Sequence, residues 1–170
     1  VARKLLEVFP ADVESGCGHE LAALAFRGLM RPKEEAESLR RWAAESGDAM
    51  AAFQRLMVLD FGERNWPGLE QSARWALAVN PLLKQPHEML AAALENLGRP
   101  EEAVASLRKL QSLRPDNPTD TNFRLARLLK DKDRPASRRY LLDALADAPR
   151  HREALQLLEA MQDNPPAPHP

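Results

Sequence analysis

Residues 84–117 read KQPHEMLAAALENLGRPEEAVASLRKLQSLRPDN, and this stretch decides the fold. It contains two segments whose apolar residues recur three and four positions apart, on either side of Gly98-Arg99-Pro100. Residues at that spacing share one face of a helix, so each segment is predicted to be an amphipathic helix. Glycine suits the end of a helix and proline suits its first turn. The stretch therefore predicts a hairpin of two helices.

The hairpin recurs along the chain with a fixed period. The period is 34 residues: it separates Pro81 from Pro115 and Pro115 from Pro149, and Gly47 stands one period before Pro81. Two columns of small or apolar residues keep the same spacing: Leu39, Ala73, Leu107 and Leu141, and Trp42, Ala76, Leu110 and Ala144. One period before Leu39 and Trp42, the two columns continue at Leu5 and Val8. In each of the four later repeats, a proline stands shortly before the column residues: Pro32, Pro67, Pro100 and Pro135. The columns predict the buried stripe of one recurring helix, and the prolines predict its start.

The period predicts an all-α chain with about ten helices. We expect one repeat domain over residues 1–163, made of a half unit (1–13), four units (about 14–47, 48–81, 82–115 and 116–149) and a capping helix (150–163). The first helices of the four units are predicted at about 17–29, 49–61, 85–97 and 119–131. Residues 164–170 hold four prolines and are predicted to be a flexible tail.

Composition excludes several classes of protein. Leucine and alanine dominate, isoleucine is absent, and only six valines and two threonines occur, which is incompatible with a sheet-based fold. The formal net charge of −1 argues against a nucleic-acid partner. No apolar run approaches the roughly 20 residues that span a bilayer, so membrane insertion is not expected. Compartment and oligomeric state are left open.

These residues resemble the tetratricopeptide repeat, whose period of about 34 residues is the same. The unit over 84–117 matches best, through Leu90, Ala91, Leu94, Gly98, Ala103, Leu107, Leu110 and Pro115. The next unit keeps Leu125, Ala126, Leu129, Ser137, Leu141, Ala144 and Pro149, with a turn shorter by one residue. The resemblance implies a right-handed α-solenoid of antiparallel hairpins. It also implies a protein-interaction scaffold that binds a peptide or a partner helix in a concave groove.

The resemblance further implies which residues line that groove. The family's groove positions fall on Gln85, Glu88, Ala92 and Glu95 in one first helix, and on Phe123, Arg127 and Lys130 in the next, with Arg124 beside them. In our functional interpretation, the basic residues bind carboxylates of a partner peptide, because guanidinium groups pair with them in bidentate fashion. The alternative is a solvated helix face with local ion pairs to Asp120 and Asp131. A chaperone-type carboxylate clamp is not expected, since Glu88 and Ala92 replace its lysine and asparagine.

No catalytic, metal-binding or cofactor-binding site is predicted. The pairs His19-Glu20 and His87-Glu88 begin like a zinc-protease helix, but Ala23 and Ala91 replace the second histidine. The pair of Cys17 and His19 has no neighbouring ligands in the sequence. We expect Trp42 and Trp75 to be packing residues, and an aromatic binding cage of Trp66 and Trp75 is the alternative.

A second class of function follows from the start of the chain. It opens Val1-Ala2-Arg3-Lys4, without an initiator methionine and inside the first predicted apolar stripe, which predicts a piece of a longer protein. The 18 arginines against 6 lysines are typical of a bacterial source. Residues 123–158 resemble the tails of bacterial metallopeptidase-like proteins, which implies a C-terminal domain for substrate docking or assembly. RNA binding by related helical hairpins is disfavoured, because the repeats share no base-reading position.

Overall fold

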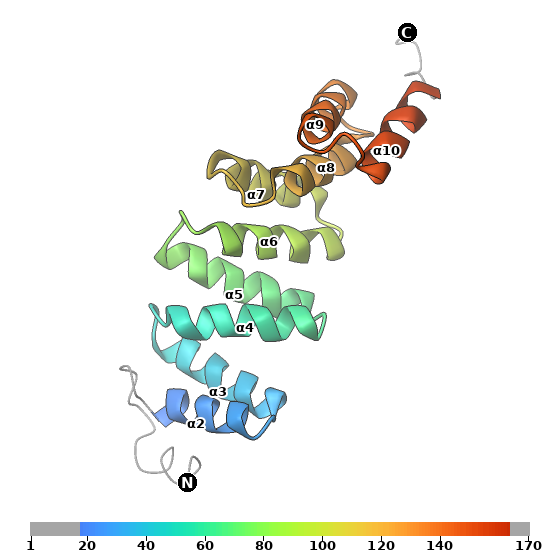
Figure 1. Ribbon diagram of the computed structural model, residues 1–170. Helices are drawn as coiled ribbons and strands as arrows, with labels where there is room; N and C mark the ends of the chain where they lie inside the picture. Colours follow the sequence, from blue (N-terminus) through green and yellow to red (C-terminus); the bar gives the residue numbers. More distant parts are fainter. Residues whose placement is uncertain (1–17, 164–170) are drawn as a thin grey trace. The chain divides into compact units, whose positions relative to one another are not determined.

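The computed structural model describes residues 18–163, which form nine helices and no strand (Figure 1). The helices are α2 (Gly18–Gly28), α3 (Pro32–Glu45), α4 (Met50–Gly62), α5 (Trp66–Val79), α6 (Lys84–Asn96), α7 (Pro100–Ser112), α8 (Pro118–Leu129), α9 (Arg134–Asp147) and α10 (Arg152–Asp163). The prediction of an all-α fold is confirmed. The half unit over 1–13, with Leu5 and Val8, and the tail over 164–170 lie outside the described residues, as does Cys17.

The chain divides after Gly98 into two compact units. In the first unit, α2 to α6 pack in chain order, each helix against the next, and α4 also contacts α6 (Figure 1). In the second unit, α7 packs on α8, α8 on α9 and α9 on α10. We refer to α2, α4, α6 and α8 as the first helices and to α3, α5, α7 and α9 as the second helices. Their bounds agree with the predicted hairpins to within a few residues.

The helix starts follow from proline and from capping side chains. Each second helix has one of the predicted prolines as its first or second residue, and Pro118 opens α8 in the same way. A proline there removes no hydrogen bond from the helix, because the N–H groups of the first turn have no partner within the helix. The side chains of Asn65, Asn117 and Asp133 accept hydrogen bonds from backbone N–H groups three residues later. These caps fix where α5, α8 and α9 begin.

The turn inside each of the first three hairpins requires a left-handed residue. Met30, Arg64 and Gly98 stand one period apart and have φ values of 54°, 56° and 71°. Glycine adopts this conformation freely, whereas methionine and arginine carry a steric penalty of about 1 kcal/mol there. The α8–α9 turn has four residues, 130–133, against three in each of the other hairpins, so the prediction of a shorter turn is wrong; none of these four residues has a positive φ. The period therefore extends to the backbone conformation of the turns.

The core includes the two predicted columns and their counterparts on the first helices. Every member of the two columns from position 39 onward is buried, with Ala73, Leu107 and Leu141 at 0% exposure. Buried residues of the first helices repeat similarly, with the second interval longer by one residue: Leu56, Leu90 and Leu125, and Met57, Ala91 and Ala126. Within each unit, the paired helices α2–α3, α4–α5 and α8–α9 thus bury these stripes against each other, and the column prediction is confirmed for the described residues.

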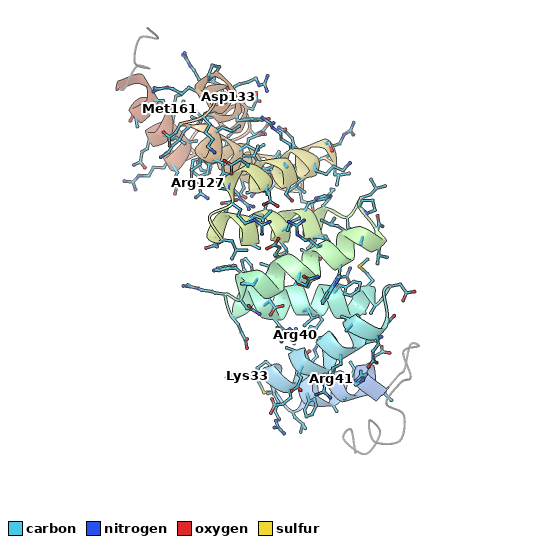
Figure 2. The ribbon with its side chains drawn as sticks, turned by 180° about the vertical axis from the view of Figure 1, so that it is seen from behind. Lys33, Arg40, Arg41, Arg127, Asp133 and Met161 are labelled. Carbon is cyan, nitrogen blue, oxygen red and sulfur yellow. The ribbon has the colours of Figure 1, made fainter. Side chains whose placement is uncertain are left out.

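The α3–α4 interface also contains two ion pairs that the apolar pattern does not predict. Arg55 donates to both carboxylate oxygens of Glu35, with Nε–Oε1 at 2.6 Å and Nη2–Oε2 at 2.9 Å. These hydrogen bonds raise the pKa of the Arg55 guanidinium above its usual value. Arg40 Nη2 lies 2.5 Å from Asp60 Oδ1, and Arg40 is labelled on α3 in Figure 2. Glu35 and Asp60 are 3% and 1% exposed, so both carboxylates depend on these partners.

Asp60 has a second partner at the start of α5. The Asn65 side chain donates to Asp60 Oδ1 at 2.7 Å, while its own oxygen caps Gly68 N. A Cβ at position 68 would lie 2.8 Å from Asp60 Oδ1 and closer still to the Asn65 amide. Only glycine leaves room for this arrangement. The Arg40–Asp60–Asn65 cluster therefore ties α3, α4 and α5 together within the first unit.

Candidate functional site

The groove positions expected on α6 form part of the first unit. Gln85 and Glu88 are exposed, and Ala92 and Glu95 are half-buried. Their spacing of three and four residues places them along one side of the helix. The opposite side carries Leu90, Ala91 and Leu94 into the core. This face of α6 can therefore meet a partner without disturbing the packing of the unit.

The basic positions lie on α8 in the second unit. Arg127, labelled in Figure 2, and Lys130 are both exposed. Lys130 follows the last residue of the helix. Arg124 differs from them, because its side chain is only 13% exposed and its Nη1 lies 3.7 Å from Asp120 Oδ2. The local ion pair of the alternative interpretation is therefore present for Arg124. The exposure of Arg127 and Lys130 keeps both accessible to external carboxylates.

Phe123 belongs to a contact between α8 and the residue before α10. Its ring centroid lies 5.0 Å from that of His151. His151 Nδ1 accepts a hydrogen bond from Ala154 N at 3.2 Å and so caps the start of α10. Phe123 is half-buried and thus has a packing role besides its predicted groove role. The predicted set consequently falls in two compact units, four residues on α6 and four at positions 123–130.

Three exposed apolar residues stand at the repeat equivalents of the expected groove positions, and the sequence analysis does not predict them. Leu24 and Val58 stand two periods and one period before Ala92, and Phe61 stands one period before Glu95. Their side chains are 55%, 48% and 46% exposed on α2 and α4. The Phe61 ring packs edge-on against Trp66, with centroids 6.1 Å apart. The repeat period was the signal that would have found them, by counting back from the positions assigned on α6.

The tryptophans pack as expected at two of the three positions. Trp42 is 7% exposed and belongs to the buried column. Trp75 stacks on Phe53 with centroids 5.7 Å apart. Because Trp66 and Trp75 lie against different phenylalanines, the contacts favour packing over a shared aromatic cage.

A pocket of about 220 Å³ lies between α7 and α8, entirely within the second unit. It is lined by Pro100, Glu101, Val104, Arg108, Leu128, Leu129 and Lys132. Lys132 forms an ion pair with Glu101 at the pocket. Val104 and Leu129 give it an apolar floor, each 8% exposed. The pocket therefore combines an apolar interior with charged groups around it.

The two histidines in the His-Glu pairs are buried within the first unit. His19 Nε2 lies 3.4 Å from Glu45 Oε2, and His87 Nε2 lies 3.0 Å from the Pro81 carbonyl oxygen. Within residues 18–163, no three His, Cys, Asp or Glu side chains are grouped as metal ligands would be. In the same part of the chain, none of the helices is long and apolar enough to cross a bilayer.

Comparison with solved structures places the chain among helical-repeat proteins. YrrB, a TPR protein described as having an unusual peptide-binding site, gives a TM-score of 0.73 at 14% identity, over 96% of this chain and 82% of its own. MamA gives 0.62 at 16% identity, over 96% of this chain and 88% of its own. The O-GlcNAc transferase of Thermobaculum terrenum gives 0.54 at 21% identity, over 76% of this chain but 25% of its own.

At the level of sequence, no protein-family description and no curated protein matches the chain. Identities this low show the fold alone. The repeat period, the paired helices and the similarity to YrrB agree on that fold. The chain therefore has the fold of the tetratricopeptide-repeat proteins, as its residues indicated.

Proposed function

We propose that the protein is a non-enzymatic interaction module that binds a peptide or an amphipathic helix along its first helices. The observation that carries this proposal is the exposure of Leu24 and Val58 at repeat-equivalent positions of α2 and α4, together with that of Phe61 one turn further along α4. Apolar side chains exposed in register, together with polar Gln85 and Glu88 on α6, are typical of helix or peptide docking surfaces. Aromatic residues such as Phe61 frequently dominate binding energy at such surfaces.

The partner is proposed to carry carboxylates as well as apolar residues. In the second unit, Arg127 and Lys130 present positive charge on and just after α8. Within residues 119–152 there are 9 basic against 5 acidic residues, while the whole chain carries −1. Such a local excess attracts acidic segments and raises their association rate at low salt. The charge reversals Arg127→Glu and Lys130→Glu should therefore weaken capture of an acidic partner without lowering Tm by more than a few degrees.

The test begins with a library of phage-displayed random 16-residue peptides selected on the whole chain. Binding of the enriched peptides is then measured for the double variant Leu24→Ser/Val58→Ser and for the matched control Leu142→Ser. Leu142 is 50% exposed but lies on a second helix. We expect at least tenfold weaker binding for the double variant and no change for the control. Equal binding by all three proteins, or no enrichment at all, contradicts the proposal.

A second candidate function is that of a helical domain appended to a larger enzyme, for substrate docking or subunit assembly. The similarity to the O-GlcNAc transferase favours this candidate. This chain covers only a quarter of the transferase, so a similar repeat array there belongs to a much longer chain. The resemblance of residues 123–158 to the tails of metallopeptidase-like proteins points the same way. Reading the residues encoded upstream of Val1 tests this candidate. A catalytic domain there supports it, and an initiator methionine directly before Val1 overturns it.

A further inference from the structure

Arginine occupies the same position in three successive second helices. Arg40, Arg74 and Arg108 stand one period apart on α3, α5 and α7. In α3, the guanidinium of Arg40 bonds with Asp60 of the following first helix at 2.5 Å. In α5, Arg74 Nε bonds instead with Glu70 Oε1 at 2.9 Å, one turn earlier in the same helix. The carboxylate beside this arginine thus comes from the next helix in one repeat and from the arginine's own helix in the other.

The third copy has lost both carboxylates. The position of Glu70 is taken one period later by Val104. The residue equivalent to Asp60 is Leu94 in the next unit and Leu129 in the unit after that, which begins one residue later than the period predicts. Arg108 is exposed, and no ion pair joins it to a carboxylate of the described residues. The two residues that replaced the carboxylates, Val104 and Leu129, line the α7–α8 pocket together with Arg108.

We propose that this pocket binds an acidic side chain of a partner peptide, a glutamate with an aliphatic neighbour. The glutamate carboxylate takes the place that the carboxylates of Asp60 and Glu70 hold beside the equivalent arginines, and bonds with the Arg108 guanidinium. The methylene groups of the glutamate and its aliphatic neighbour pack on Val104 and Leu129. A volume of about 220 Å³ suits one or two side chains rather than a small-molecule ligand, whose sites measure about 300–1,000 Å³.

The charges around the pocket favour this occupant. Lys132 already has a carboxylate partner in Glu101, so this pair adds no net charge and Lys132 does not compete for the peptide. Arg108 is the lining group that can still take a carboxylate. None of the lining residues belongs to the first-helix positions proposed above, so this site is separate from the proposed docking surface. Its failure and the failure of the proposed function are therefore distinguishable.

The test uses a titration of the whole chain with the capped peptide acetyl-Ala-Leu-Glu-Leu-Ala-amide, followed by NMR. The matched peptide carries glutamine in place of glutamate, and sodium acetate tests the carboxylate alone. We expect the glutamate peptide to shift the Arg108 side-chain N–H and the Val104 and Leu129 methyl resonances, with at least fivefold tighter binding than either control. Equal binding of the glutamine peptide, or of acetate, overturns the proposal.

Three variants and a double variant test whether Arg108 and the pocket account for the binding. Arg108→Gln changes an exposed side chain and should abolish the preference for glutamate without loss of helicity. Val104→Glu supplies an internal carboxylate four residues before Arg108, as Glu70 does for Arg74, and should close the site. Arg74→Ala is the matched control, and Leu24→Ser/Val58→Ser tests independence from the docking surface, so both should bind the glutamate peptide as the unaltered chain does. Retained preference for glutamate in Arg108→Gln overturns the proposal.

Discussion

The α3–α4 and α7–α8 pairs have the same place in the repeat but use charge in opposite ways. Between α3 and α4, two carboxylates that are almost fully buried meet two arginines, in the Glu35–Arg55 and Asp60–Arg40 pairs. At the equivalent positions of α7 and α8, alanine and leucine replace the acids, as Ala103 and Leu129. The arginines remain in the second pair although these acids are gone. One interface is thus closed by ion pairs, and the other keeps a pocket.

The fate of the two arginines shows what the loss of a partner does. Arg124, the equivalent of Arg55, is mostly buried and pairs with Asp120 on its own helix. Arg108, the equivalent of Arg40, stays exposed at the pocket. A guanidinium held in a buried pair keeps its carboxylate partner satisfied, whereas an exposed one can bind an external group without disturbing the fold. The comparison therefore separates structural arginines from those available to a partner.

The largest expected effect comes from breaking the Glu35–Arg55 pair. Arg55→Met leaves a buried carboxylate without its partner and should lower the free energy of unfolding by about 3 kcal/mol. The double variant Glu35→Leu/Arg55→Met copies Leu69 and Met89, which hold these positions one period later, and should recover to within about 1 kcal/mol of the unaltered chain. Urea unfolding followed by tryptophan fluorescence reports on the first unit, which contains all three tryptophans. A double variant as unstable as the single one would contradict this account.

A smaller loss is expected at Arg40. Arg40→Ala removes the ion pair to Asp60 but leaves the hydrogen bond from Asn65, so we expect a loss of about 2 kcal/mol. The same fluorescence-detected urea unfolding measures it. Arg41→Ala is the matched control, because Arg41 is the neighbouring arginine and pairs along α3, with Glu37. An effect of Arg40→Ala no larger than that of the control would show that Asp60 does not depend on Arg40.

Crowding around the same cluster gives the next effect. Gly68→Ala brings a Cβ against Asn65 and Asp60, and we expect a net loss of about 1 kcal/mol, since the better helix propensity of alanine offsets part of the overpacking. The control Gly62→Ala has no atom within 4 Å of its new Cβ and should be neutral or stabilising. The difference between the two midpoints in urea measures the effect. Stabilisation by both substitutions would mean that the cluster can move aside.

The smallest effects are expected at the other two arginines of the column. Arg74→Ala removes a partly exposed pair within one helix and should lower stability by about 0.3–0.5 kcal/mol. Arg108→Ala removes no ion pair of the described residues and should leave the free energy of unfolding unchanged within error. Circular dichroism in urea covers both units and gives both values. A loss of more than about 1 kcal/mol for Arg108→Ala would assign that arginine a structural role and weaken the comparison.

Much of the fold could be predicted because it depends on neighbours in the sequence. The starts of the second helices follow from prolines at known positions, and the buried columns follow from spacing of three and four residues. Buried charge was not predictable in the same way. Asp60 lies in the last turn of an apolar helix and reads as a surface residue, yet it is 1% exposed. Its environment is made by residues of α3 and α5, which local spacing does not locate.

The candidate site shows the same division. The period places Leu24, Val58 and Phe61 in register with the positions assigned on α6, but their exposure is a property of the packed helices. The contact between Phe123 and His151 joins residues far apart in the sequence and comes from the packing at the start of α10. The sequence alone also left open whether Arg124 is a surface residue or a paired one.

The sequence by itself determined the period, the hairpins and the buried stripes, because each rests on the local geometry of helices. Arg40, Arg74 and Arg108 are indistinguishable in that pattern, with one spacing and one place in the second helix. Only the tertiary structure decided which partner each arginine has. Arg40 pairs with a carboxylate of the next helix, Arg74 pairs with one of its own helix, and no carboxylate of the described residues pairs with Arg108. The physical reason is that a hydrogen-bonded ion pair needs its atoms within about 3 Å, and the packing of helices sets that distance.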